Sequence, residues 1–153
     1  MVQVAPLRRT ARPLGATVRV IEIERKFLVA QRPSDLEGWP STAIEQGYLT
    51  VKAGGGRVRV EEEIEIDGDR FERLWPLTEG RRIEKTRYEI DAGGGLVIEL
   101  DVYTGALDGL ATAEVEFDSE EAADAFEPPD WLGEDVTEDL RYKNQRLARE
   151  GPP

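Results

Sequence analysis

Three charged side chains alternate near the start of this chain: Glu22, Glu24 and Lys26. Successive side chains of an extended strand point to opposite faces, so these three share one face while Ile23 and Phe27 lie on the other. A row of two carboxylates and an ammonium is costly to bury unless something neutralises it. The obvious neutralising group is a divalent metal ion bound to a polyanion. The segment therefore predicts a site for a metal and a polyanion.

The composition restricts the chemistry that is open to such a site. Of the 153 residues 34% are charged, and the formal net charge of −12 argues against a nucleic-acid-binding surface. The chain has no Cys and no His, which excludes disulfides, thiolate chemistry and imidazole as a base or metal ligand. A metal must then be held by oxygen, which points to Mg²⁺, Mn²⁺ or Ca²⁺. Catalysis would depend on carboxylates, Lys, Arg, Tyr and metal-bound water.

The length of the chain predicts a single domain, which we place at residues 20–150. Residues 1–19 carry four Arg and no acid. We expect them to be a disordered basic tail or the result of a misassigned start codon. No apolar run approaches the roughly 20 residues that cross a bilayer. We therefore expect a cytoplasmic protein that has no membrane partner.

Alternation of apolar and charged residues dominates the chain and predicts strands. Six are expected, over residues 19–29, 46–52, 57–66, 81–90, 96–103 and 111–117. Glycine triplets at 54–56 and 93–95 predict turns. Helical spacing and N-cap residues predict three helices, over residues 71–77, from Ser119 to before Pro128, and over residues 137–148.

Two architectures fit strands with one apolar and one charged face. An open sheet with a solvated face explains the pattern, and periodicity alone favours it. Closure into a barrel would instead line a lumen with charges of both signs and pack the apolar face against helices. The charges are not mixed at random, because acids recur in i, i+2 pairs and Lys52, Lys85 and Arg87 are placed in the same way.

A family resemblance decides between these architectures. Residues 22–29 resemble the Glu-x-Glu-x-Lys signature of the CYTH superfamily, the triphosphate tunnel metalloenzymes. Further segments resemble its small bacterial members in the family's order: residues 45–49, 71–88, 99–103, 113–117 and 141–144. The resemblance implies a mainly β (α+β) fold, an antiparallel eight-stranded barrel or tunnel with flanking helices. It also implies hydrolysis of inorganic triphosphate or a related triphosphate, with Mg²⁺ or Mn²⁺ as the cofactor.

The resemblance and the charge of triphosphate together predict which residues form the site. Cations must hold the phosphates, and seven are expected to do so: Lys26, Lys52, Arg57, Arg59, Lys85, Arg87 and Lys143. Carboxylates must act through divalent ions, and the expected metal ligands are Glu22, Glu24, Glu63, Glu99, Asp101, Glu114 and Glu116. Catalytic roles are expected for Lys26, Lys85 and Glu116. For Lys143 a solvated helix position is the plainer interpretation.

One departure from the family pattern affects the predicted barrel wall. The family has an Arg-x-Arg strand, a Thr-x-Lys strand and a Gly-rich turn where this chain has residues 49–59. Either residues 50–52 are the Thr-x-Lys strand and the Arg-x-Arg strand is absent, or residues 57–59 are the Arg-x-Arg strand and the other is absent. Both alignments predict an incomplete wall, with about six strands instead of eight. We expect that part of the site survives and that turnover is reduced or abolished.

Five hypotheses about the function therefore remain open. The leading expectation is an inorganic triphosphatase that acts on a small triphosphate-containing molecule. A non-hydrolysing binder of polyphosphate or nucleotide is the first alternative. Adenylate cyclisation and thiamine triphosphate hydrolysis are known in the family and follow. A structural acidic barrel would bind no ligand and would show no rise in melting temperature with one. The expected oligomeric state is a monomer or homodimer.

Overall fold

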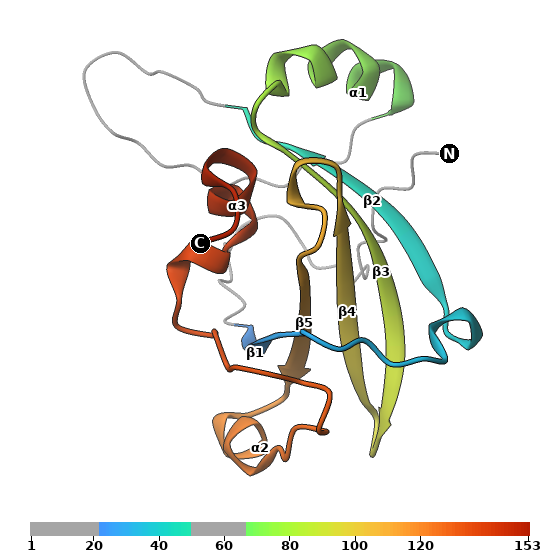
Figure 1. The fold of residues 1–153 in the computed structure, drawn as a ribbon, viewed down its shortest axis with the longest axis vertical. Helices are drawn as coiled ribbons and strands as arrows, with labels where there is room; N and C mark the ends of the chain where they lie inside the picture. The colour runs from blue at the N-terminus through green and yellow to red at the C-terminus, as the bar shows by residue number, and fades with distance from the viewer. Residues whose placement is uncertain (1–21, 50–66) are drawn as a thin grey trace, which may run out of the picture.

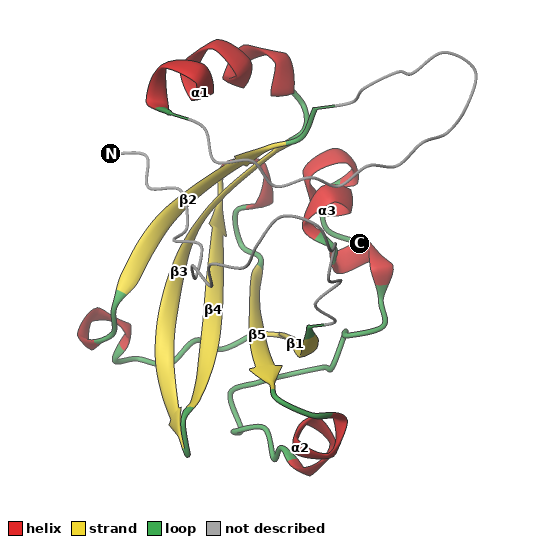
Figure 2. Ribbon diagram, turned by 180° about the vertical axis from the view of Figure 1, so that it is seen from behind, coloured by secondary structure: helices red, strands yellow, loops and turns green. Residues whose placement is uncertain are grey.

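A five-stranded antiparallel sheet is the centre of the structure, a computed structural model that describes residues 22–49 and 67–153 (Figure 1). The strand order is β1-β5-β4-β3-β2. The elements are β1 (Ile23–Leu28), β2 (Ser41–Gly47), α1 (Gly68–Leu74), β3 (Arg82–Gly93), β4 (Leu96–Thr104), β5 (Ala111–Phe117), α2 (Glu120–Ala125) and α3 (Asn144–Glu150). Figure 2 shows the strands side by side, with α1 and α2 at opposite ends of the sheet. The predicted mainly β class with flanking helices is confirmed.

Local sequence signals explain several of these boundaries. The predicted turn at 93–95 joins β3 to β4, and its three glycines have φ values of 80°, 63° and 85°, a region that side chains other than glycine rarely adopt. The Asp67 carboxylate accepts a hydrogen bond from Arg70 N and caps α1. The Ser119 hydroxyl accepts one from Ala122 N and caps α2. These caps satisfy amide groups that the first helical turn leaves without partners.

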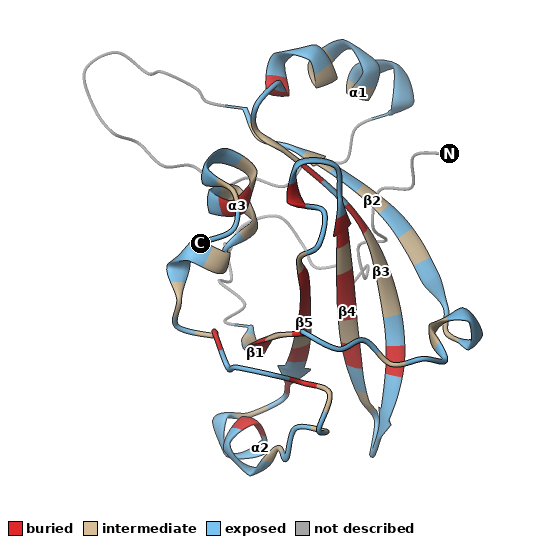
Figure 3. Cartoon of the chain, in the orientation of Figure 1, coloured by how far each residue is buried: buried red, intermediate tan, exposed pale blue. Residues whose placement is uncertain are grey.

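Alternate residues of the strands build an apolar face on one side of the sheet. Its centre is Phe27, Ile98, Leu100, Ala113 and Val115, each at most 1% exposed. Ala123 of α2 and Leu132 in the chain that follows it pack against the same cluster. Figure 3 shows the buried segments concentrated on β4 and β5. Burial of this surface is the main contribution to folding.

The opposite side of the sheet has a smaller apolar cluster at one end only. Ile83 of β3, Tyr103 of β4, Leu107 and Leu147 of α3 form it, and each is at most 3% exposed. Helix α3 therefore covers that end of the sheet. The remainder of this side carries the alternating charged residues, and we call it the charged face. Its charged members in the described strands include Glu24, Lys26, Lys85, Arg87, Glu89, Glu99, Asp101, Glu114 and Glu116.

Residues 133–137, which we call the strap, run along the outer edge of β1. Gly133 N donates to Leu28 O, Leu28 N donates to Glu134 O, and Val136 N donates to Lys26 O, at 2.7, 2.9 and 2.8 Å. Strap residue Asp135 also pairs with Arg25 at 2.8 Å. The strap thus hydrogen-bonds to the edge of the strand that carries the Glu-x-Glu-x-Lys motif, which would otherwise expose unpaired backbone groups.

One strand was not predicted, and one boundary prediction is wrong. The unpredicted strand is Ser41–Gly47, which pairs with β3 and places Ile44 opposite Lys85. The predicted strand at 46–52 overlaps it only at its first two residues, and residues 50–52 lie outside the described residues. The third helix lies at Asn144–Glu150 and not at 137–148, because the chain up to Thr137 is committed to the edge of β1. The predicted strand at 57–66 and the predicted tail at 1–19 lie outside the described residues.

The sheet is not closed in the part of the chain that the structure describes. Strands β1 and β2 are its two terminal strands and do not pair with each other there. This agrees with the expected incomplete wall. Among the described helices none is long and apolar enough to cross a membrane.

Candidate active site

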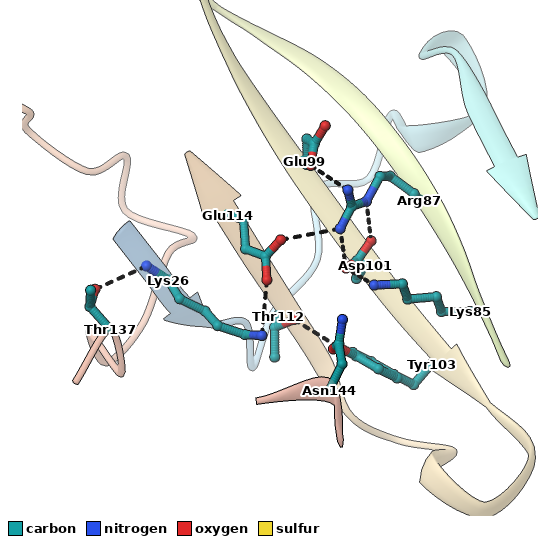
Figure 4. A network of polar contacts seen from close by, with 10 residues as sticks. All are labelled: Lys26, Lys85, Arg87, Glu99, Asp101, Tyr103, Thr112, Glu114, Thr137 and Asn144. Atoms are coloured by element: carbon teal, nitrogen blue, oxygen red, sulfur yellow. Dashed lines mark hydrogen bonds and ion pairs between the residues drawn. The ribbon is translucent and has the colours of Figure 1, made fainter. Parts of the chain in front are cut away.

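Strand register brings charges from four strands together on the charged face. Lys26 of β1 lies opposite Glu114 of β5, and Glu114 lies opposite Glu99 of β4. Arg87 of β3 lies opposite Asp101 of β4. Since directly opposite residues of antiparallel strands have neighbouring side chains, the alternation in the sequence becomes one continuous cluster. Figure 4 shows these side chains pointing toward one another.

The innermost part of the cluster is a buried triad of Lys85, Asp101 and Arg87. Lys85 Nζ donates to Asp101 Oδ2 at 2.5 Å. Arg87 donates through Nε to Oδ1 and through Nη2 to Oδ2, both at 2.7 Å. The side chains of Lys85 and Asp101 are each 1% exposed. Asp101 therefore binds the buried Lys85 ammonium and, through both its oxygens, the Arg87 guanidinium, whose side chain is 22% exposed.

The outer part of the cluster is more accessible to solvent. Arg87 also forms ion pairs with Glu99 and, at 3.2 Å, with Glu114. Lys26 Nζ donates to Glu114 Oε1 at 2.9 Å. The side chains of Glu99 and Glu114 are 32% and 17% exposed. These pairs are less buried than the triad, so an entering ligand can replace them at lower cost.

The pKa values of acidic groups on the charged face are shifted in opposite directions by their surroundings. Burial alone would raise the pKa of Asp101, but the hydrogen bond from Arg87 and the charge of Lys85 outweigh it, and the pKa lies below its ordinary value. Burial raises the pKa of Glu24, and the negative charge of Glu114 adds to the effect. Burial also raises the pKa of Glu99 despite the opposing charge of Arg87. Asp101 thus favours its ionised form, while Glu24 and Glu99 lack full charge compensation.

Three polar residues that the sequence did not identify support the buried end. The Tyr103 hydroxyl donates to Asn144 Oδ1 of α3 at 3.0 Å and lies 3.4 Å from Thr112 Oγ1. Lys85 Nζ lies 5.6 Å from the centre of the Tyr103 ring, a cation–π distance. Asn144 follows Lys143 in a segment that the family resemblance covers. The phase of Tyr103 with Glu99 and Asp101 was the one available signal for its position.

The carboxylate oxygens of the charged face are the donor type that Mg²⁺ and Mn²⁺ prefer. The charges of Glu114, Glu22 and Glu116 all raise the pKa of Glu24, so these acids act on one another. A divalent ion placed among them would relieve that repulsion. In the described residues, however, no three acidic side chains stand together in a metal-binding arrangement, and Glu99 and Glu114 bind cations of the protein. The carboxylate oxygens are thus of the right type to bind such an ion. Glu99 and Glu114 would have to release Arg87 and Lys26 to do so.

The predicted site residues fall into three groups. The structure brings six of them into one cluster: Lys26, Lys85, Arg87, Glu99, Asp101 and Glu114. Glu24 and Glu116 lie opposite each other on β1 and β5, and both are exposed, as are Glu22 before β1 and Lys143 before α3. Lys52, Arg57, Arg59 and Glu63 lie outside the described residues.

The chain was compared with known proteins. No protein-family profile matches it. An inorganic triphosphatase from Nitrosomonas europaea is 51% identical over 145 residues, which cover 83% of this chain and 96% of the relative. An inorganic triphosphatase from Acetivibrio thermocellus is 42% identical over 107 residues, 69% of this chain and 67% of the relative. The crystal structure of the inorganic triphosphatase NE1496 superposes with a TM-score of 0.72 at 48% identity, over 88% of this chain and 98% of that one.

The match to the Nitrosomonas europaea relative also bears on chain length. Since 83% of 153 residues is about 127, roughly 18 positions of the 145-residue match have no counterpart in this chain. A matched segment with fewer residues than the relative's agrees with the expectation of a reduced barrel wall.

Proposed function

The chain belongs to the family of inorganic triphosphatases, and from this premise we propose that it hydrolyses inorganic triphosphate at the charged face of its sheet. The observation that carries the proposal is the convergence of Lys26, Lys85 and Arg87 with several carboxylates on that face. Identity of 51% to a named inorganic triphosphatase supports the same conclusion.

The three cations are the proposed ligands of the substrate. Triphosphate carries several negative charges, and a planar guanidinium can bind phosphate oxygens in a bidentate way. Arg87 already points its Nη1 and Nη2 groups toward Glu99 and Glu114, the less buried side of the cluster. On this proposal phosphate oxygens replace those carboxylates, and Lys26 exchanges Glu114 for phosphate in the same way. The bound triphosphate would then lie across β1, β5, β4 and β3.

The proposed cofactor is a divalent ion, Mg²⁺ or Mn²⁺, held by carboxylates of the charged face. Glu24, Glu114 and Glu116 would hold it, with Glu22 and Glu99 as further ligands; Glu63 is the proposed ligand from outside the described residues. When bound, such an ion neutralises phosphate charge and acidifies the attacking water. The chain has no His, so an acid of this face would accept the proton of that water. Glu116 is the proposed base, because among the described residues it forms no ion pair and is exposed.

One alternative function is favoured by a specific observation. The sheet is open in the described residues, and roughly 18 positions of the match to the relative have no counterpart in this chain. A weakened wall would reduce the hold on the phosphates and could leave binding without turnover. In that case the protein would be a non-hydrolysing binder of polyphosphate.

The first experiment measures phosphate release from tripolyphosphate by a colorimetric assay, with Mg²⁺ or Mn²⁺ and with EDTA. We expect release of one orthophosphate per triphosphate with either metal and none in EDTA. Thiamine triphosphate and ATP serve as competing substrates, with cyclic AMP measured as a product. If calorimetry shows that tripolyphosphate binds but no phosphate is released, the protein is a non-hydrolysing binder and the proposed hydrolysis is wrong. Absence of both binding and release would contradict the proposal.

A further inference from the structure

Asp101 differs from the other acids of the charged face in how its oxygens are used. Both oxygens accept hydrogen bonds: Oδ1 from Arg87, and Oδ2 from Arg87 and Lys85. The side chain is 1% exposed. A metal ion bound to either oxygen would stand beside an ammonium and a guanidinium, both of which repel it. Metal binding at Asp101 would therefore require the loss of the most buried ion pairs in the cluster.

Glu99 makes an instructive contrast, because it lies two residues away on the same strand and the same face. Only its Oε2 atom contacts Arg87, and its side chain is 32% exposed. Its pKa is raised by burial, whereas that of Asp101 is lowered by its cationic partners. Glu99 can exchange Arg87 for another cation and remain solvated on one side. Asp101 has no comparable freedom.

The surroundings of Asp101 also fix the cations that it binds. Tyr103 lies next along the charged face, with its ring 5.6 Å from Lys85 Nζ. The Tyr103 hydroxyl is held in turn by Asn144 at the start of α3. Figure 4 shows Lys85, Asp101 and Arg87 side by side, with Tyr103 and Asn144 below them in this view. Lys85 and Arg87 are thus held from the buried side, while Arg87 keeps two nitrogens directed to the open side.

We propose that Asp101 is a positioning residue that orients Lys85 and Arg87 toward triphosphate, and that it does not bind the metal ion. The inference rests on the proposed function only in taking triphosphate as the anion. Asp101 keeps Lys85 and Arg87 in place after Glu99 and Glu114 have exchanged Arg87 for phosphate. Orientation before binding lowers the entropic cost of gripping the ligand.

The test separates anion binding from metal binding in full-length protein. Calorimetry in EDTA gives the Kd for tripolyphosphate, and the Mn²⁺ concentration at half-maximal phosphate release gives the metal dependence. We expect Asp101→Asn to raise the metal-free Kd at least 10-fold, although it removes a negative charge that repels the anion. The Mn²⁺ half-saturation should change less than 2-fold. Glu99→Gln is the matched variant, with the same charge change, and should not raise the metal-free Kd.

A second variant covers the case in which Asp101→Asn does not fold, which circular dichroism would reveal. Asp101→Glu keeps the charge but moves the carboxylate by one methylene, so a metal-free Kd raised at least 3-fold would report geometry and not charge. The inference is overturned if either folded variant raises the Mn²⁺ half-saturation 10-fold or more, or leaves the metal-free Kd unchanged or lower. If wild-type protein neither binds nor hydrolyses tripolyphosphate, the proposed function fails, and that outcome is distinct from either variant result.

Discussion

Leu100 and Asp101 are consecutive residues of β4, both with 0% exposure, and they lie on opposite faces of the sheet. Leu100 is buried among apolar side chains that stabilise the fold by leaving water. Asp101 is buried among cations, where desolvation costs free energy that its ion pairs must offset. The side chains of β4 on the apolar face therefore stabilise the fold, while those on the charged face hold charged groups in fixed positions.

Full burial alone does not show whether a side chain stabilises the fold or takes part in ligand binding. The groups that surround the buried side chain distinguish the two cases. On the apolar face a truncation leaves a cavity, and the loss appears as free energy of unfolding. On the charged face the loss should appear mainly as affinity and turnover. Three variants test how sharply the two faces divide these roles.

The largest expected effect is on the charged face. Arg87→Ala should lower kcat/KM for tripolyphosphate by about 10³-fold, because the transition state loses a guanidinium that neutralises phosphate charge. Arg82→Ala on the same strand is the control: Arg82 lies on the other face, 4.4 Å from the centre of the Trp75 ring, and should keep activity within about 3-fold. Steady-state kinetics on folded protein measures both. Equal losses in the two variants would contradict the division between faces.

The second effect belongs to the apolar face. Leu100→Ala should lower the free energy of unfolding by about 3 kcal/mol, through lost burial and the cavity left behind. Urea denaturation measures it, and kcat of the folded fraction should stay near the wild-type value. Val97→Ala is the control, since Val97 is 44% exposed on a neighbouring position of β4, with an expected change within about 0.5 kcal/mol. A large drop in kcat for folded Leu100→Ala would show that the faces are coupled.

The smallest expected effect concerns the strap, which hydrogen-bonds to the outer edge of β1. Burial alone would raise the pKa of Asp135, but hydrogen bonds from Thr137 and Arg25 outweigh it and lower the pKa below 3.8. A lowered pKa means that the carboxylate stabilises the fold above its ordinary pKa and loses this effect as the pH falls through the lowered value. Asp135→Asn should cost about 1 kcal/mol at pH 7, discounted because the site is partly exposed.

Urea denaturation at pH 7 and at several values below 3.8 measures this difference, which should shrink as the pH falls. Asp130→Asn makes the same charge change in the same loop, at an exposed position, and should have no effect at any pH. A difference for Asp135→Asn that persisted unchanged in acid would show that the ion pair does not contribute.

The sequence predicted most of the sheet because alternation is a local property. The residues of β1, β3, β4 and β5 alternate strongly, so both the strands and the faces of Phe27, Glu114 and Lys85 could be assigned in advance. Strand β2 was not predicted because Ser41–Gly47 has a weak apolar pattern, with every second residue exposed. Its position is set by pairing with β3 and by the close approach of Gly47 to Thr78, where a Cβ would lie 2.6 Å from the side chain.

The sequence predicted which residues form the candidate site, but it did not predict which acid pairs with which cation. Lys26, Lys85 and Arg87 were expected to bind an anion, and the acids to bind a metal. Cross-strand register decides which acid meets which cation, and register depends on the tertiary pairing of strands. Glu99 and Asp101 are both acidic and lie on the same face, yet only Asp101 binds Lys85 as well as Arg87. Asp101 also precedes Tyr103 on this face, and Tyr103 bonds to Asn144 of α3. Their different burial could not be read from the strand alone.

The strap has a consequence for synthesis of the protein. Lys26 N donates to Thr137 Oγ1 across 111 residues, and the Lys26 side chain reaches Glu114 across 88 residues. At about 5–20 residues per second on the ribosome, β1 waits roughly 5–20 s for the partner on its outer edge. Such a high contact order makes completion of β1 a late folding event. A nascent chain thus carries the Glu-x-Glu-x-Lys segment unassembled until Glu114 and then the strap have been synthesised.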